Sequence, residues 1–233
     1  MAQTAPSPDV SASAPVAAPA AEASAPAVVA APAPAPAPAA PPAPVPLTKP
    51  GPVAQDSLNA ADTAWMMTST ALVLLMTLPG IALFYGGMVR RKSVINTMAS
   101  VVAIAALVSL LWFAVGYSLA FTPGHTWLGG TERLWFSGLN YMKEAGQVAV
   151  SHVAPNIPES VYAMFQLTFA IITCALIVGA FVERMRFSAM LWFIGLWSVV
   201  VYAPIAHWVW EPGGWLVQLG VCLLYTSDAA DER

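Results

Sequence analysis

TAWMMTSTALVLLMTLPGIALFYGGMVRRK, residues 63–92, is the stretch of sequence that decides the fold. It opens with 27 consecutive residues without a charge and closes on three basic residues, Arg90, Arg91 and Lys92. About 20 predominantly apolar residues are enough for a helix to cross the hydrocarbon core of a bilayer. The stretch therefore predicts a membrane-spanning helix that ends at a basic connection.

Three further stretches have the same character. Residues 93–121, 160–182 and 187–210 carry no charge and are mostly apolar. We therefore predict an all-α integral membrane protein with four spans, at about 65–89, 94–121, 160–182 and 187–209. Pro79 and Pro204 should kink the first and the fourth span.

The charges of the connections predict an orientation. The two tight connections hold five positive charges, Arg90, Arg91, Lys92, Arg184 and Arg186. The loop between the second and third spans holds two, and acidic residues oppose them. Basic residues in short loops mark the cytoplasmic side. We expect the amino terminus and the 122–159 loop to lie outside.

Composition excludes several other classes of protein. Charged residues make up 9% of the chain, against about 25% in soluble domains. The net charge of −3 gives no basic footprint for nucleic acid. The two cysteines, Cys174 and Cys222, are too few for a disulfide framework and do not form a zinc motif. No enzymatic chemistry, cofactor or metal is expected.

The chain divides into three unlike segments: 1–61, 62–221 and 222–233. The first is rich in Ala and Pro, with the run APAPAPAPAAPPAPVP at residues 31–46, and is expected to be a disordered arm. A spacer is the favoured interpretation of this arm, and a ligand for an aromatic-grooved domain is the alternative. The sequence leaves open whether a signal peptide precedes Met1.

Aromatic residues near the outer ends of the spans form the candidate site. Phe165 and Phe169 are four residues apart and share a helix face, and Trp210 lies at a matching height at the end of the fourth span. Aromatic faces attract a desolvated cation. The alternative is an interfacial aromatic belt, which composition alone favours.

The spans carry no Asp, Glu, Lys or Arg at mid-depth, so a charged relay is not expected within the membrane. The histidines offer little chemistry by position. His125 and His152 fall in the outer loop and are expected to be solvated, whereas His207 is expected to be a hydrogen-bonded structural residue.

Ordered motifs carry a family resemblance over about residues 62–221. DTAWMMTSTALVLLMTLPGIALFYGGMVRRKSVINTM, GYSLAF, FQLTFAIITCALIVGAFVERMRFSA and PIAHWVWEPGGW together resemble the ammonium transporter (Amt/Rh) family, in its bacterial form. The resemblance implies the first four helices of an eleven-helix bundle, a homotrimer in a bacterial inner membrane, and ammonium or methylammonium as substrate. It also implies a possible PII-type regulatory protein as a partner on the cytoplasmic side.

The resemblance assigns roles to the aromatic residues. Trp210 matches the tryptophan of the family's outer cation cage, Phe169 matches the phenylalanine of the cage and upper gate, and Phe165 is the weaker assignment. The family's pore aspartate and histidines have no counterpart here, since residues 222–233 read CLLYTSDAADER and resemble a non-native tail. The chain is therefore expected to be an inactive piece of a transporter. The alternatives are a sensor module fused to a signalling domain and a plain membrane anchor.

Overall fold

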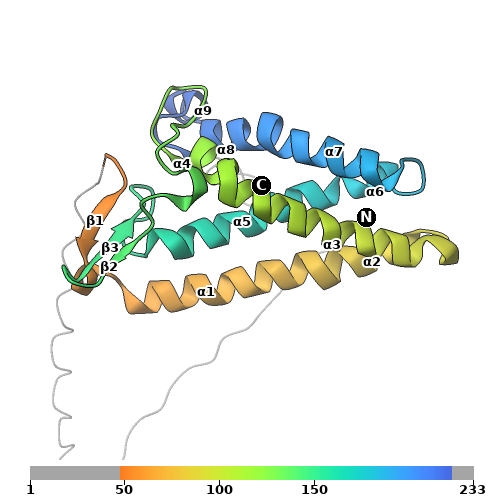
Figure 1. The fold of residues 1–233 in the computed structure, drawn as a ribbon, viewed down its shortest axis with the longest axis horizontal. Coiled ribbons are helices and arrows are strands. Elements are labelled where there is room, and N and C mark those ends of the chain that lie inside the picture. The colour runs from red at the N-terminus through yellow and green to blue at the C-terminus, as the bar shows by residue number, and fades with distance from the viewer. Residues whose placement is uncertain (1–47, 222–233) are drawn as a thin grey trace, which may run out of the picture. The chain divides into compact units, whose positions relative to one another are not determined.

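The computed structural model describes residues 48–221, which belong to one compact unit of the chain (Figure 1). The disordered arm and the non-native tail expected from the sequence lie largely outside the described residues. The elements in chain order are β1 (Gly51–Ala54), α1 (Ala60–Leu75), α2 (Ala82–Met88), α3 (Val94–Leu111), α4 (Tyr117–Phe121), β2 (Tyr141–Met142), β3 (Gln147–Val150), α5 (Glu159–Leu176), α6 (Val178–Phe181), α7 (Phe187–Trp197), α8 (Ala203–Trp210) and α9 (Trp215–Gln218).

These helices join into the four predicted spans. Within the described part, the helical stretches long and apolar enough to cross a membrane are Ala60–Met88, Arg91–Phe121, Glu159–Phe181 and Phe187–Gln218. The predicted fold class is confirmed. The first span begins earlier than expected because the Asn59 side chain caps it, accepting hydrogen bonds from the backbone N–H groups of Ala61 (2.9 Å) and Asp62 (3.2 Å).

Wide π-helical turns interrupt three of these spans, at Met76–Ile81, Trp112–Gly116 and Ser198–Tyr202. The first contains Pro79, and the third lies directly before α8, where Pro204 occupies the first turn. Proline has no N–H to donate, so a carbonyl upstream of it loses its usual partner. Local π adjustments and hydroxyl side chains satisfy such groups inside a membrane. A π-helical turn thus accompanies each of the two prolines, whereas the middle turn has no proline.

The segment before α1 and the loop between α4 and α5 together form a small antiparallel sheet in the order β1-β3-β2. Gly51 of β1 pairs with Val150 of β3, and Ala54 pairs with Gln147. Residues 51–61, which the sequence assigns to the Ala/Pro arm, therefore form a strand, a short 3₁₀ turn and the start of α1. The sheet fixes the chain just before the first span.

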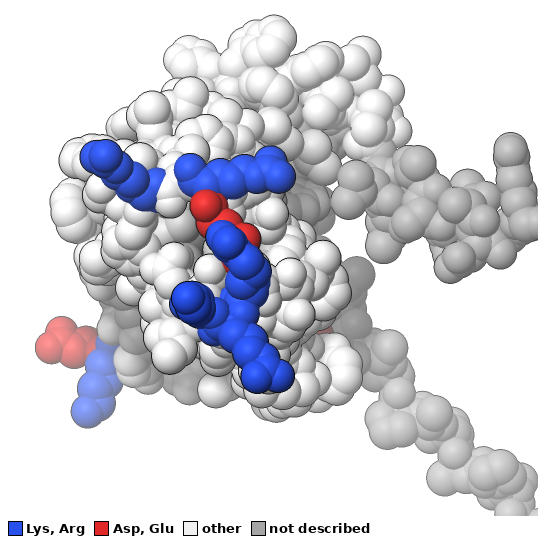
Figure 2. All heavy atoms as spheres, turned by 90° about the vertical axis from the view of Figure 1, so that its right-hand side faces the viewer, with Lys and Arg blue, Asp and Glu red and all other residues white. Residues whose placement is uncertain are grey.

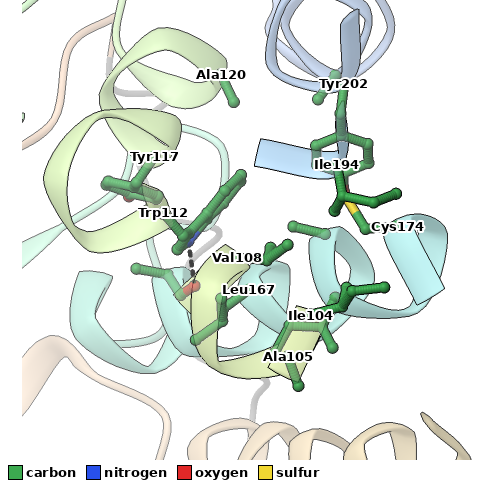
Figure 3. Packing of buried hydrophobic residues seen from close by; sticks show 14 of the residues in the cluster. Ile104, Ala105, Val108, Trp112, Tyr117, Ala120, Leu167, Cys174, Ile194 and Tyr202 are labelled. Atoms are coloured by element: carbon green, nitrogen blue, oxygen red, sulfur yellow. Dashed lines mark hydrogen bonds between the residues drawn. The ribbon is translucent and has the colours of Figure 1, made fainter. Parts of the chain in front are cut away.

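The core is a cluster of buried apolar side chains from α3, α4, α5 and α7 (Figure 3). Trp112 lies at its centre with 3% of its surface exposed, and its indole N–H donates to the carbonyl of Ala163 on α5 at 3.1 Å. Ile104 and Val108 of α3 pack in the same cluster as Ile194 of α7. The indole hydrogen bond satisfies the one polar group of the tryptophan, so the large ring can be buried at little cost.

The two tight connections meet at the opposite end of the spans from the sheet (Figure 1). Lys and Arg side chains surround an acidic residue on this face (Figure 2). Arg90, after α2, donates from its backbone N–H and its Nε to Oε1 of Glu183, after α6, both at 3.2 Å. Hydrogen bonds from the Ser93 hydroxyl and from Arg90 lower the pKa of Glu183. We call this face the basic end.

Large apolar side chains also face outward along the spans. Ile95 of α3 is 82% exposed and Trp192 of α7 is 81% exposed. Such a surface is stable in lipid or against further helices, but it is costly in water. The exposed apolar faces therefore agree with the lengths of the spans in placing this bundle in a membrane.

Candidate functional site

Four aromatic rings form a chain of contacts between the ends of α4 and α8 and the first two-thirds of α5. Trp210 is the last residue of α8, and Phe121 is the last residue of α4. The ring centroids of Phe121 and Trp210 are 6.2 Å apart with planes 9° from parallel. Phe169 meets Trp210 edge-on at 6.4 Å, and Phe165 meets Phe169 edge-on at 5.1 Å. We call Phe121, Phe165, Phe169 and Trp210 the aromatic group.

The structure places the three predicted site residues in one chain of contacts, with Phe169 between Phe165 and Trp210. All three are partly buried, so each ring keeps some accessible surface. Phe121 was missed by the sequence reasoning. It ends the GYSLAF motif that carried the family resemblance, but no spacing rule connects α4 with a residue 89 positions later.

A short turn fixes the place where α8 ends. The backbone N–H of Glu211 donates to the His207 carbonyl at 3.2 Å, and that of Gly214 donates to the Glu211 carbonyl at 2.8 Å. A Cβ atom on Gly214 would lie 2.4 Å from the His207 carbonyl oxygen and 2.6 Å from that of Trp208. Only glycine allows this close return of the chain, which leaves Trp210 at the helix end.

His207 ties α8 to its neighbours from one turn before Trp210. The ring is buried, with Nδ1 3.1 Å from the carbonyl oxygen of Ala120 and Nε2 2.8 Å from that of His125. The expected role of His207 as a hydrogen-bonded structural residue is confirmed.

His152 differs from the prediction. Its side chain is 3% exposed rather than solvated, and its Nε2 lies 2.7 Å from Oε1 of Glu211, whose side chain is also 3% exposed. No sequence pattern predicts this pair, because the two residues are 59 positions apart and both fall in segments that resemble surface loops.

A second buried ion pair lies at the start of α5. Oε1 of Glu159 accepts hydrogen bonds from Nε of Arg133 and from the Tyr117 hydroxyl, both at 3.0 Å. Glu159 is 1% exposed, and the Arg133 side chain is 14% exposed. The pair joins the loop between α4 and α5 to the first residues of these two helices. It therefore connects α4 and α5, the two helices that carry the phenylalanines of the aromatic group.

The chemistry available to the aromatic group is attraction of a cation. The negative faces of Trp and Phe rings attract a small cation by about 0.5 to 2 kcal/mol each, more strongly where water is excluded. Across residues 48–221, no group of three or more His, Cys, Asp or Glu side chains is arranged to hold a metal ion.

Comparison with known proteins agrees with this arrangement. Residues 64–231 match the model of the Ammonium Transporter Family, so the match runs past Val221 into the tail. The chain is 47% identical over 163 residues to an ammonium transporter of Bacillus subtilis and 44% identical over 168 residues to one of Aquifex aeolicus. These alignments cover 70% and 72% of this chain, but 38% of each relative.

Among solved structures, Candida albicans Mep2 is similar to this chain, with a TM-score of 0.62 and 33% identity. The similarity covers 71% of this chain and 34% of that protein. The chain thus spans little more than a third of the length of the proteins that it matches.

Proposed function

The chain belongs to the ammonium transporter family, whose members are transporters rather than enzymes, and from that premise we propose that the complete protein carries ammonium or ammonia across a membrane. Because this chain covers 38% of its relatives, transport is assigned to the complete protein and not to these four spans alone. The observation that carries the proposal is the contact between the partly buried rings of Phe169 and Trp210.

In this proposal, Trp210 and Phe169 bracket an incoming ammonium ion, and Phe165 supports Phe169. Phe121 stacks against Trp210 and holds its ring in place. The cation keeps part of its water or finds acceptors nearby, since the rings alone return much less free energy than dehydration costs. Capture should therefore weaken when one ring is removed, without being abolished.

The test is uptake of labelled methylammonium by cells that express the complete protein. Trp210→Leu should raise the half-saturation concentration about two- to thirtyfold, the range that one cation–π contact supplies. Trp192→Leu is the matched control, because it removes the same kind of ring from an exposed side of α7, away from the aromatic group. Uptake is expressed per mole of assembled protein. An unchanged half-saturation concentration in Trp210→Leu would contradict the proposed cage.

We further propose that the protein lies in a bacterial inner membrane with the amino terminus outside and the basic end in the cytoplasm. The five cations of the two tight connections support this orientation. Single cysteines at the exposed positions Glu144 and Lys92, in a background without native cysteines, should react with a membrane-impermeant reagent only from outside and only from inside, respectively. The reverse pattern would overturn the orientation.

The assembly of the complete protein as a homotrimer, and a PII-type regulator as its cytoplasmic partner, belong to the same proposal. The basic end offers the surface on which an acidic cytoplasmic loop could bind. Cross-linking of the purified protein in detergent tests the trimer, and co-purification with the regulator tests the partner.

A further inference from the structure

The buried pair of His152 and Glu211 lies directly beside Trp210 along the chain. Glu211 follows Trp210 at the end of α8, and His152 is the second residue after β3. We propose that this pair is a positioning element, which fixes the end of α8 against the outer loop and thereby sets the orientation of the Trp210 ring. The proposal rests on the function proposed above, because the orientation of that ring matters only if it contacts the substrate.

The Glu211 carboxylate is not needed to form its own turn. Backbone hydrogen bonds close that turn, from Glu211 to His207 and from Gly214 to Glu211. The next two residues, Pro212 and Gly213, are exposed, so the turn itself lies at the surface. The Glu211 side chain nevertheless points inward and is buried, which costs free energy unless the charge is paired. Its burial serves the contact with His152.

His152 brings a rigid support to that contact. Val150, at the end of β3, is fully buried, pairs with Gly51 of β1 and forms a bridge to Pro158. The Ser151 hydroxyl then accepts a hydrogen bond from the backbone N–H of Val153 at 3.3 Å. The backbone on either side of His152 is therefore fixed by hydrogen bonds. Through its contact with Glu211, the His152 ring restricts the position of the end of α8.

The charges around the pair favour a closed contact. Glu159 lies within electrostatic range of His152, and Tyr162 lies within range of Glu211. Arg133 pairs with Glu159, so His152 is the partner that remains for Glu211. Removal of His152 leaves the buried Glu211 side chain without this partner, which costs free energy.

The pair also acts on the aromatic group at close range. Tyr162, which lies within electrostatic range of Glu211, meets Phe121 edge-on with ring centroids 5.3 Å apart. Phe121 in turn stacks on Trp210. A displacement of Glu211 thus reaches the Trp210 ring by two routes, through the adjacent peptide bond and through the two intervening rings.

The test reports the orientation of Trp210 without relying on transport. The complete protein is labelled with 5-fluorotryptophan, and the Trp210 resonance is assigned by its loss in Trp210→Phe. In His152→Phe, which keeps an aromatic ring but removes the donor, the fluorine resonance of Trp210 should shift or broaden while that of Trp192 stays in place. In His152→Gln, whose amide can still donate to Glu211, it should return toward its original position.

Uptake of methylammonium by the same variants provides the second readout. His152→Phe should raise the half-saturation concentration by at most about thirtyfold, the loss of one whole cation–π contact, with little change in the maximal rate per assembled molecule. His152→Gln should recover most of the loss. His125→Ala is the matched control, because it removes an exposed histidine of the same outer loop.

The outcomes separate this proposal from the one on which it rests. If the unaltered protein takes up no methylammonium, the proposed function fails, while the fluorine resonance still decides the role of the pair. An unmoved Trp210 resonance in His152→Phe, or a His152→Gln variant that behaves like His152→Phe, would overturn the positioning role. Should His152→Phe not fold, the double variant His152→Phe/Glu211→Leu leaves no unpaired charge. The proposal then requires the Trp210 resonance to stay displaced, whereas a return to its original position would show that the pair only fills space.

Discussion

Replacing Glu159 by Gln should destabilise the protein far more than any change at the exposed ion pair of the basic end. Glu159→Gln keeps the shape of the side chain and its bond from Tyr117, but removes the charge that balances Arg133. Breaking a buried pair costs about 3 to 5 kcal/mol, because the remaining charge stays desolvated. Arg133 keeps a second hydrogen bond, from Nη1 to the Ser137 carbonyl at 3.3 Å, so we expect the lower end of that range.

Two further variants give the scale for this measurement. Tyr117→Phe removes only one donor to the same carboxylate, while the ion pair with Arg133 remains, and should cost about 1.5 to 3 kcal/mol. Arg90→Gln breaks a pair whose arginine is 80% exposed, and such surface pairs contribute little. The ratio of these effects follows from burial, since the closest N–O distances of the two ion pairs, 3.0 and 3.2 Å, are nearly equal.

The assay is unfolding of the purified complete protein in mixed micelles, followed by tryptophan fluorescence as the fraction of denaturing detergent rises. The expected order of lost stability is Glu159→Gln, then Tyr117→Phe, then Arg90→Gln. Equal shifts of the unfolding midpoint in Glu159→Gln and Arg90→Gln would refute this prediction, because they would show that burial does not determine the strength of the two ion pairs.

Three other predictions concern packing and pH. Gly179→Ala should cost about 1 to 3 kcal/mol in the same unfolding assay, because its Cβ would lie 2.5 Å from the ring of Tyr85, and Tyr85→Ala should relieve most of that loss. Trp112→Phe should cost about 1 to 3 kcal/mol by leaving a buried carbonyl without its donor, and a loss near zero would contradict the hydrogen bond. The pKa of Glu183 is lowered in the folded protein. Its contact with Arg90 should therefore persist as pH falls to the ordinary carboxyl pKa of about 4.3, and be lost only as pH falls through the lower folded pKa. A carbon-13 NMR titration of the Glu183 carboxyl measures this pKa, and a midpoint above 4.3 would refute the prediction.

The spans could be predicted from sequence because a bilayer imposes a local rule. A long charge-free apolar stretch indicates a membrane-spanning helix whatever its neighbours are, so all four spans could be predicted one at a time. Strand β1 gave no such signal, since Gly51–Ala54 becomes a strand only by pairing with β3, almost a hundred residues later. The π-helical turn at Trp112–Gly116 was equally hidden, because no proline marks it.

Helix geometry and the family motifs predicted part of the candidate site. The four-residue spacing placed Phe165 and Phe169 on one face, and the family resemblance connected Phe169 with Trp210. Phe121 and the His152–Glu211 pair could not be found in this way, because their partners come from other elements. A polar residue in a loop also gives no sign, by composition alone, that the loop folds inward and buries it.

The π-helical turns give three of the spans an unusual tolerance to changes in chain length. Each such turn holds one residue more than an α-helical turn, so the segments before and after it are offset by that residue. Deleting a single residue within Met76–Ile81, Trp112–Gly116 or Ser198–Tyr202 should restore regular winding and keep both flanking faces where they are. The same deletion elsewhere in a span would rotate everything beyond it by about 100°. Natural insertions and deletions within these helices should therefore concentrate at the three turns.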